Sequence, residues 1–232
     1  MELINSWVEL APFASEYMVA CSQDENFVQG WRLSNGSAVL LNTGDGYRLL
    51  IGGECSPLDY VRILTEASTQ GTPAASANVP YSLAEQIKPE KSRDWFYMVR
   101  KNARPHVALP PDCYVVRPNE IDQEIARFLQ LNAPDSSALP GDPEIDFWIV
   151  ARDGNSEIAA VCAGTTWGSG TKIVASVAVG IDHRRQGWGS VVTMLGLQEH
   201  FNRGAQSVGL GVRGSNSGAI DMYRSLGFDS EY

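Results

Sequence analysis

Within Val177–Ser190, a strand of small apolar residues leads through a turn rich in arginine and glycine directly into a helix (Val-Ala-Val-Gly-Ile-Asp-His-Arg-Arg-Gln-Gly-Trp-Gly-Ser). Backbone N–H groups at a helix start have no intrahelical acceptors, and the helix dipole adds positive potential, so they bind anions. Gly187 and Gly189 let the backbone approach an anion closely, and Arg184 and Arg185 add positive charge beside it. Pyrophosphate is the anion that suits this turn. A tight strand-to-helix turn that needs glycine for its geometry alone would show the same pattern.

The pattern of apolar residues predicts the elements that hold this turn in place. The second half of the chain reads strand, helix, three strands, helix, strand, helix. Asn216 is typical of a residue that caps the start of the last helix, and Gly227 of one that ends it. The expected elements occupy residues 114–117, 120–131, 147–152, 157–166, 172–179, 188–202, 207–212 and 217–226.

Two signatures in this half resemble those of the GNAT N-acetyltransferase superfamily. Arg184-x-x-Gly187-x-Gly189, preceded by Val-x-Val, resembles the central acyl-CoA signature of that family. The segment 212–228 (Val-Arg-Gly-Ser-Asn-Ser-Gly-Ala-Ile-Asp-Met-Tyr-Arg-Ser-Leu-Gly-Phe) resembles the second signature, N-x-x-A-x-x-x-Y-x-x-x-G-F. The two occur in the order and at the spacing that the family shows. The resemblance covers about residues 112–232, roughly half of the chain.

The resemblance implies a fold and a reaction. The fold would be of the α/β (α+β) class, with a mixed, mostly antiparallel, splayed sheet flanked by helices in a catalytic domain at 112–232. The reaction would be the transfer of an acetyl group from acetyl-CoA to a primary amine, by direct attack of the neutral amine on the thioester. The enzyme would position the two reactants, hold the oxyanion on backbone N–H groups and manage protons.

The resemblance also implies roles for individual residues. The main chain of Val177 and Val179, with Ala178 between them, would hold the pantetheine arm as an additional strand. Asn216 would contact the pantetheine or order its loop, and Tyr223 would donate a proton to the departing thiolate. The pyrophosphate would lie on the backbone N–H groups of the turn, with arginine charge beside it; the residues of that turn are Arg184, Arg185, Gln186, Gly187, Trp188, Gly189 and Ser190.

Each role has a structural alternative. Tyr223 falls on one helical face with Ala219 and Leu226, so it is also placed to be a core tyrosine. Asn216 can serve only as a helix cap, and the two arginines can be solvated surface charges. At the level of function, the alternative to an enzyme is a catalytically weak acyl-CoA-binding module that acts as a sensor or an interaction partner.

The sequence departs from the family in two places. Related ribosomal-protein acetyltransferases carry a glutamate as base on the strand before the second signature, where this chain has Gly211. Asp146, Glu144 and Asp182 are alternative bases, and a water chain or an already neutral substrate would also serve. The second departure is that only Asp229–Tyr232 follows Gly-Phe. The last strand is therefore very short, supplied by the N-terminal half, or absent.

The first half carries neither signature. Residues 1–104 read as a smaller accessory α/β domain, and if they form a degenerate GNAT-like domain, that domain lacks an acyl-CoA loop. Ser56 and Pro57 predict the start of a helix, and the prolines within 104–112 indicate a linker to the second half. The expected strands lie at 30–33, 38–41, 47–52 and 95–99, the helices begin at 56 and 82, and irregular segments occupy 70–80 and 132–144.

Composition narrows the possible partners. The 232 residues include 27 acidic and 18 basic side chains, so the net charge is −9 and the pI is about 4.8. This balance argues against nucleic-acid binding and against docking on an anionic membrane. No secretory signal or membrane-spanning run is visible, the four cysteines are scattered, and the three histidines lack metal-ligand spacing. We therefore expect a cytoplasmic protein with reduced thiols, no metal and acetyl-CoA as cosubstrate; its oligomeric state is left open.

The negative charge is concentrated in one segment. Residues 111–150 hold 8 acidic and 2 basic side chains, a net charge of 2 − 8 = −6, whereas residues 151–232 hold 7 of each. In relatives, this first helix and loop commonly flank the acceptor pocket. We hypothesise that the acceptor, a small-molecule amine or a peptide N-terminus, is cationic. A solvated acidic face is the alternative.

Overall fold

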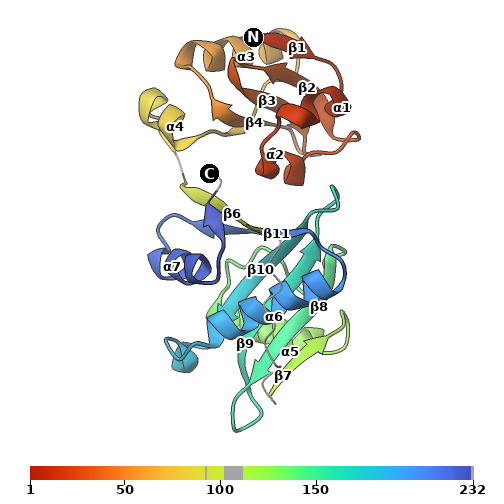
Figure 1. The fold of residues 1–232 in the computed structure, drawn as a ribbon, viewed down its shortest axis with the longest axis vertical. Helices are drawn as coiled ribbons and strands as arrows, with labels where there is room; N and C mark the ends of the chain where they lie inside the picture. Colours follow the sequence, from red (N-terminus) through yellow and green to blue (C-terminus); the bar gives the residue numbers. More distant parts are fainter. Residues whose placement is uncertain (92, 102–111, 231–232) are drawn as a thin grey trace. The chain divides into compact units, whose positions relative to one another are not determined.

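The computed structural model describes residues 1–91, 93–101 and 112–230, which form two compact units, each built on its own sheet (Figure 1). The first unit spans Met1–Arg93 and the second Asp94–Ser230. The division between them lies ahead of the linker predicted at 104–112, most of which falls outside the described residues. Among the helices of the described residues, none is long and apolar enough to cross a membrane.

The second unit contains a seven-stranded sheet in the order β12-β6-β11-β10-β9-β8-β7. Its neighbouring strands are antiparallel except for β10 and β11, which are parallel. The predicted order of elements in this half of the chain is confirmed, with small shifts at the element ends. The strands are β6 (Trp95–Lys101), β7 (Cys113–Val116), β8 (Ile145–Arg152), β9 (Ile158–Thr166), β10 (Lys172–Val179), β11 (Ser207–Arg213) and β12 (Asp229–Ser230).

Helices cover both faces of this sheet. Helix α5 (Asp122–Asn132) lies on one face, and α6 (Trp188–Asn202) and α7 (Ser217–Ser225) lie on the other (Figure 1). Residues of β8 alternate between the two cores, since Phe147 packs with side chains of α6 whereas Trp148 packs with those of α5. Because both faces are buried, β8 and β9 are apolar almost throughout instead of alternating with polar residues.

Strand β6 corrects one expectation. The sequence predicts a strand at 95–99 that closes the first half of the chain; the strand exists, but its assignment to that half is wrong. It pairs antiparallel with β11 from Ser207↔Lys101 to Arg213↔Trp95 in the sheet of the second unit. Met98 is fully buried there among side chains of β11 and α7. Strand pairing between such distant segments leaves no local signal in the sequence.

The end of the sheet resolves the alternatives for the last strand. Strand β12 is only two residues long and pairs with β6 at Asp229↔Val99 and Ser230↔Met98. The last strand is thus very short, and a strand from the N-terminal half completes the sheet between β11 and β12. Two of the three alternatives therefore hold together.

Strands β10 and β11 separate soon after they meet. Their pairing is at Ile173↔Gly209. On its other side, β10 has a bulge against β9 between Ala175 and Ala178, where Ser176 adopts a left-handed backbone (φ 47°). The second half of β10 therefore has a free edge toward β11. The expected mixed, mostly antiparallel, splayed sheet flanked by helices is confirmed.

The first unit is a smaller five-stranded sheet in the order β1-β2-β3-β4-β5, in which only β4 and β5 are parallel. The helix that begins after Ser56 is confirmed as α3, and the helix near 82–87 as α4. The short elements before residue 22 and at 76–78 were not predicted. The elements are β1 (Glu2–Ile4), α1 (Trp7–Leu10), η1 (Ala11–Phe13), α2 (Glu16–Cys21), β2 (Phe27–Arg32), β3 (Asn35–Asn42), β4 (Tyr47–Glu54), α3 (Pro57–Thr69), β5 (Ser76–Asn78) and α4 (Tyr81–Ile87).

The two units repeat one order of elements. In each, a first strand and helix precede three antiparallel strands, a helix, a strand parallel to the third of them, and another helix. In the first unit, α1 and α2 pack on one face of the sheet and α3 and α4 on the other. In the second, α5 occupies one face and α6 and α7 the other. The strand that follows α4 is β6, and the strand that follows α7 is β12.

Candidate active site

The glycine turn leads from the end of β10 into the start of α6. Gly187 is the residue before the helix and has φ 88°, a left-handed conformation that favours glycine, with open space where a side chain would begin. The first bond of the helix runs from the N–H of Val191 to the carbonyl of Gly187, at 3.1 Å. The N–H groups of Trp188, Gly189 and Ser190 precede that bond, so they have no acceptor within the helix. The turn thus presents a set of donors at a positive helix end.

Close packing, and not backbone conformation, explains why residue 189 is a glycine. A Cβ atom there would lie 3.2 Å from Sδ of Met222 in α7 and 3.5 Å from Cγ2 of Val179 in β10. The end of β10, the start of α6 and α7 therefore meet at Gly189. The two glycines predicted to lie beside a phosphate differ in role: one allows the turn, and the other allows the packing that surrounds it.

Some side chains of the turn bond or pack against other parts of the protein, whereas others are exposed to solvent. The guanidinium of Arg184 donates to the carbonyls of Val179, at 3.4 Å, and Asn132, at 3.1 Å, so it ties α5 to β10. Arg185 is exposed and has a left-handed backbone (φ 60°). The Gln186 side chain donates to the carbonyl of Asp182, and Trp188 packs against the core. Nε2 of His183 lies 3.2 Å from Oδ2 of Asp153. Of the two arginines, Arg185 is the one whose side chain makes no polar contact within the described part of the structure, so it can approach an anion.

The free edge of β10 continues from this turn. Gly180 donates its N–H to Ala159 of β9 at 2.8 Å. Because successive residues of a strand point their polar backbone groups to opposite sides, Val179 and Val177 point theirs away from β9, toward the gap before β11. The side chain of Ala178 is buried on the α5 side of the sheet. An extended ligand can therefore bond the main chain on both sides of Ala178.

Tyr223 lies on the buried face of α7. Its ring packs edge-on against Phe228, with the centroids 5.8 Å apart. Within the described part of the chain its hydroxyl has no hydrogen-bond partner. Burial raises the pKa of this hydroxyl well above its ordinary value, and the nearby Cys162 adds to the shift, so Tyr223 keeps its proton at neutral pH. Burial and ring packing fit a core tyrosine, and the protonated hydroxyl also leaves the role of proton donor open.

Asn216 caps the helix that carries this tyrosine. Its Oδ1 accepts a hydrogen bond from the N–H of Ala219 at 3.2 Å, the usual arrangement at a helix start. Its amide nitrogen is not used in the cap and stays available to a ligand.

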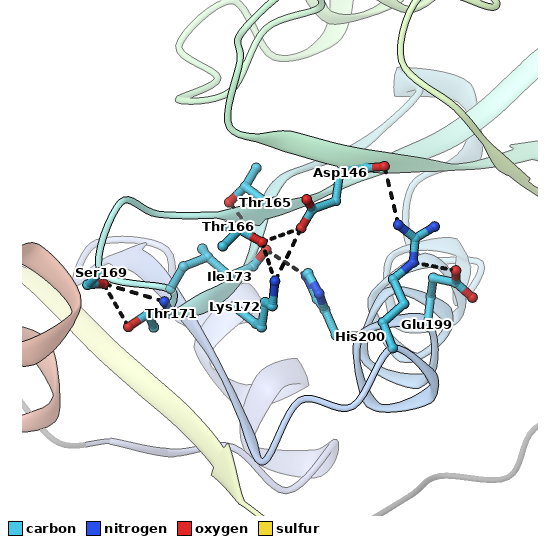
Figure 2. A network of polar contacts seen from close by, with 10 residues as sticks. Asp146, Thr165, Thr166, Ser169, Thr171, Lys172, Ile173, Glu199 and His200 are labelled. Carbon is cyan, nitrogen blue, oxygen red and sulfur yellow. Dashed lines mark hydrogen bonds and ion pairs between the residues drawn. The ribbon is translucent and has the colours of Figure 1, made fainter.

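The three alternative carboxylate bases differ in place and pairing. Asp146 accepts a hydrogen bond from Thr166, and Lys172 lies 3.8 Å from the same carboxylate, at the end of β10 away from Val179 (Figure 2). Glu144 is exposed on the loop before β8, and Asp182 is exposed beside the turn. None of these carboxylates takes the place of the glutamate that Gly211 replaces.

The space beside Gly211 holds an aromatic side chain. A Cβ atom at Gly211 would lie 3.5 Å and 3.6 Å from ring carbons of Trp95 in β6. Trp95 is half exposed, and the guanidinium of Arg213 lies 5.9 Å from its ring centroid. Sequence reasoning gave Trp95 no role, because nothing local shows that β6 lies beside β11.

The loop between α5 and β8 crosses the gap between β10 and β11. The hydroxyl of Ser176, in the bulge of β10, accepts from the N–H of Ala138 and donates to its carbonyl, at 2.9 and 2.8 Å. Three residues earlier, Asp135 lies 3.2 Å from Arg213 at the end of β11. This loop, residues 133–144, thus contacts both strands of the splay. None of these contacts had a signal in the sequence.

The acidic segment is partly neutralised. Glu124, Asp135 and Asp146, three of its eight acids, pair with Arg152, Arg213 and Lys172, all from outside the segment. The Arg152 hydrogen bond to Glu124 lowers the pKa of that carboxyl. Of these pairs, only the one at Asp135 lies at the gap between β10 and β11.

Comparison with known proteins gives the same picture. Residues 81–228, more than half of the chain, match the family described as Acetyltransferase (GNAT) family. A GNAT-family acetyltransferase from Colwellia psychrerythraea matches over 99% of this chain and 95% of its own, with a TM-score of 0.58 and 13% identity. A GCN5-related N-acetyltransferase from Sphaerobacter thermophilus matches over 84% and 73%, with a TM-score of 0.57 and 18% identity. At these identities the likeness establishes the fold alone.

A third structure, a GNAT-family acetyltransferase from Novosphingobium aromaticivorans, has a TM-score of 0.52 and 18% identity. The match covers 60% of this chain and 60% of that one, so it spans less than two thirds of the relative's length. No curated protein matches the sequence.

Proposed function

The chain belongs to the GNAT acetyltransferase family, and we propose that it transfers an acetyl group from acetyl-CoA to a primary amine of a small molecule or a peptide N-terminus. The observation that carries the proposal is the helix start at Gly187, whose unbonded N–H groups continue into the free edge of β10. A pyrophosphate followed by an extended amide-containing arm has the shape and polarity of that path. Acetyl-CoA contains both.

The residues present fit this cosubstrate. The N–H groups of Trp188, Gly189 and Ser190, with the charge of Arg185, would hold the pyrophosphate. The main chain of Val177 and Val179 would bond the pantetheine arm, and the free amide of Asn216 would add a contact. Arg184 contributes by fixing the end of β10 to α5.

The reaction needs a neutral amine and a proton donor. The amine nitrogen forms a bond to the thioester carbonyl carbon, the carbon–sulfur bond breaks, and the thiolate takes a proton. We assign this proton to the hydroxyl of Tyr223, which then regains a proton from water. With Gly211 in place of a carboxylate, the nitrogen loses its own proton to water, and the enzyme acts mainly by holding the reactants together.

A second function rests on the same departure. The absence of a carboxylate at Gly211, with the Trp95 ring beside that position, also suits a catalytically weak acyl-CoA-binding module that works as a sensor. Such a protein would bind acetyl-CoA as tightly as an enzyme does and release no thiol with any amine.

We propose that the first unit is an accessory repeat of the same fold that has no acyl-CoA site. Its helix α3 begins as α6 does, after the strand that corresponds to β10. However, Ser56 occupies the helix start by accepting from the N–H of Asp59 at 3.1 Å, Pro57 has no N–H, and the Asp59 carboxylate adds negative charge. An anion is therefore repelled from this helix start.

The proposal also includes the cellular compartment of the enzyme and the charge of its acceptor. The four cysteines are free, which fits a reducing compartment, and the acidic balance of the chain fits an amine acceptor that carries positive charge. We therefore propose a cytoplasmic enzyme that acts on a cationic amine.

Tyr223→Phe tests the catalytic role. The best acceptor is first found by screening amines for thiol release from acetyl-CoA. The variant keeps the ring and its packing on Phe228, so its affinity for acetyl-CoA should be unchanged while turnover falls about 10²- to 10⁴-fold. Tyr114→Phe, at an exposed tyrosine of β7, is the control. Turnover of Tyr223→Phe within threefold of the parent would remove Tyr223 from the mechanism.

A further inference from the structure

The ring of Trp95 lies beside Gly211, a position of the neighbouring strand that has no side chain. Its strand pairs with β11 so that Trp95 stands opposite Arg213, and its ring lies in van der Waals distance of the position that a side chain at Gly211 would take. A tryptophan is usually much more buried than the 47% exposure found here. The indole is thus partly packed beside Gly211 and about half open to solvent.

The exposed part of the indole lies on the side of the sheet away from α6 and α7. In β11, Leu210 and Val212 pack into the core with α6 and α7. Since side chains alternate along a strand, Gly211, Arg213 and their neighbour Trp95 face the opposite side, where the loop 133–144 crosses the gap. Tyr223, α6 and α7 pack in the core of the other face. With acetyl-CoA along the free edge of β10, as proposed above, the side of Trp95 is the one that α6 and α7 leave open to an amine.

On this side of the sheet, the guanidinium of Arg213 is a positive charge that another cation can replace. The guanidinium of Arg213 lies 5.9 Å from the Trp95 ring centroid and 3.2 Å from the carboxylate of Asp135. The side chains of Arg213 and Asp135 are 48% and 74% exposed, so water screens the pair and it separates at little cost. An aromatic face and a carboxylate that share one cation can take another cation in its place.

We propose that Trp95 and Asp135 form a subsite for a second cationic group of the acceptor, an ammonium or guanidinium remote from the amine that is acetylated. The cation lies over the indole and pairs with the carboxylate while Arg213 moves aside. The reacting amine is neutral, so the second charge is the part of the acceptor that the enzyme can recognise. The substrate class is accordingly a diamine, a polyamine or a basic peptide. This inference rests on the proposed function.

The test compares butane-1,4-diamine with n-butylamine, which lacks the second amine. Titration calorimetry on the full chain measures direct binding, and thiol release in the presence of acetyl-CoA measures kcat/KM. The diamine should bind measurably tighter than the monoamine and be the better acceptor. Trp95→Leu and Asp135→Asn should each weaken diamine binding by about five- to tenfold and raise KM without changing kcat. Both should leave kcat/KM for n-butylamine unchanged, because its only amine is the one that reacts.

Two further variants make the outcome decisive. Arg213→Gln removes the competing cation, so it should strengthen diamine binding; weaker diamine binding in this variant would contradict the proposal. Tyr114→Leu is the matched control, because Tyr114 is also a strand residue with 47% exposure. The proposal is overturned if the diamine does not bind, or if Trp95→Leu and Asp135→Asn bind it as the parent does. If acetyl-CoA does not bind and no amine releases thiol, the proposed function fails instead, whatever the diamine titration gives.

Discussion

Met98→Ala tests whether β6 belongs to the second unit. Met98 is fully buried, stands opposite Leu210 of β11 and packs in the same core as Tyr223 and Phe228. Replacing a fully buried methionine by alanine removes its transfer free energy and leaves a cavity, which together cost about 2–5 kcal/mol. At 3 kcal/mol, the melting temperature of the second unit should fall by roughly 6–12 °C.

Hydrogen exchange followed by mass spectrometry shows which unit is affected. Amides of β10, β11 and α6 that exchange only when the second unit opens should exchange on the order of 100-fold faster in Met98→Ala. Leu83→Ala is the matched control: Leu83 is equally buried, but in the core of the first unit beside α3. It should speed exchange in residues 1–91 and leave β10 and β11 protected. Faster exchange in residues 1–91 for Met98→Ala, with β11 unchanged, would refute the assignment of β6.

Three more outcomes follow from the second unit. Gly196→Ala places a Cβ 2.9 Å from Sγ of Cys162 and should lower the free energy of unfolding, measured by chemical denaturation, by about 1–3 kcal/mol. Adding Cys162→Ala should recover part of that loss, and strict additivity of the two changes would contradict the contact. Ser176→Ala removes both bonds to Ala138 and should speed hydrogen exchange in the loop that carries Ala138, with the core unchanged. Burial lowers the pKa of His200 to about 4, below its ordinary 6.5. The unfolded chain therefore takes up this proton first, and stability that is complete above pH 6.5 should fall by up to roughly 3 kcal/mol toward pH 4, a loss that His200→Gln should not show.

Local patterns in the sequence predicted the parts of the fold that short segments determine. The turn at Gly187 was recognised from its glycines and arginines between an apolar strand and a helix, and α7 because Asn216 and Gly227 mark its two ends. The central strands β8 and β9 were recognised because strands buried on both faces are continuously apolar.

What the sequence could not predict depends on contacts between distant segments. Strand β5, Ser76–Asn78, is polar and only three residues long, so its pairing with β4 defines it as a strand and its own residues do not. The place of β6 beside β11 and the contact of Trp95 with Gly211 arise only in the folded sheet. Gly211, which the sequence identifies as the position of a missing base, lies beside the ring of Trp95 in the structure.

Calorimetric titration with acetyl-CoA tests the central claim most directly. The parent chain should bind a single molar equivalent with micromolar affinity, because α3 of the first unit repels an anion and α6 of the second attracts it. Gly187→Asp and Gly187→Asn strain the left-handed turn alike, but only the aspartate puts a negative charge beside the N–H groups. The account predicts that the aspartate variant loses binding and the asparagine variant largely keeps it. A folded parent that does not bind, or two variants that bind equally well, would contradict it.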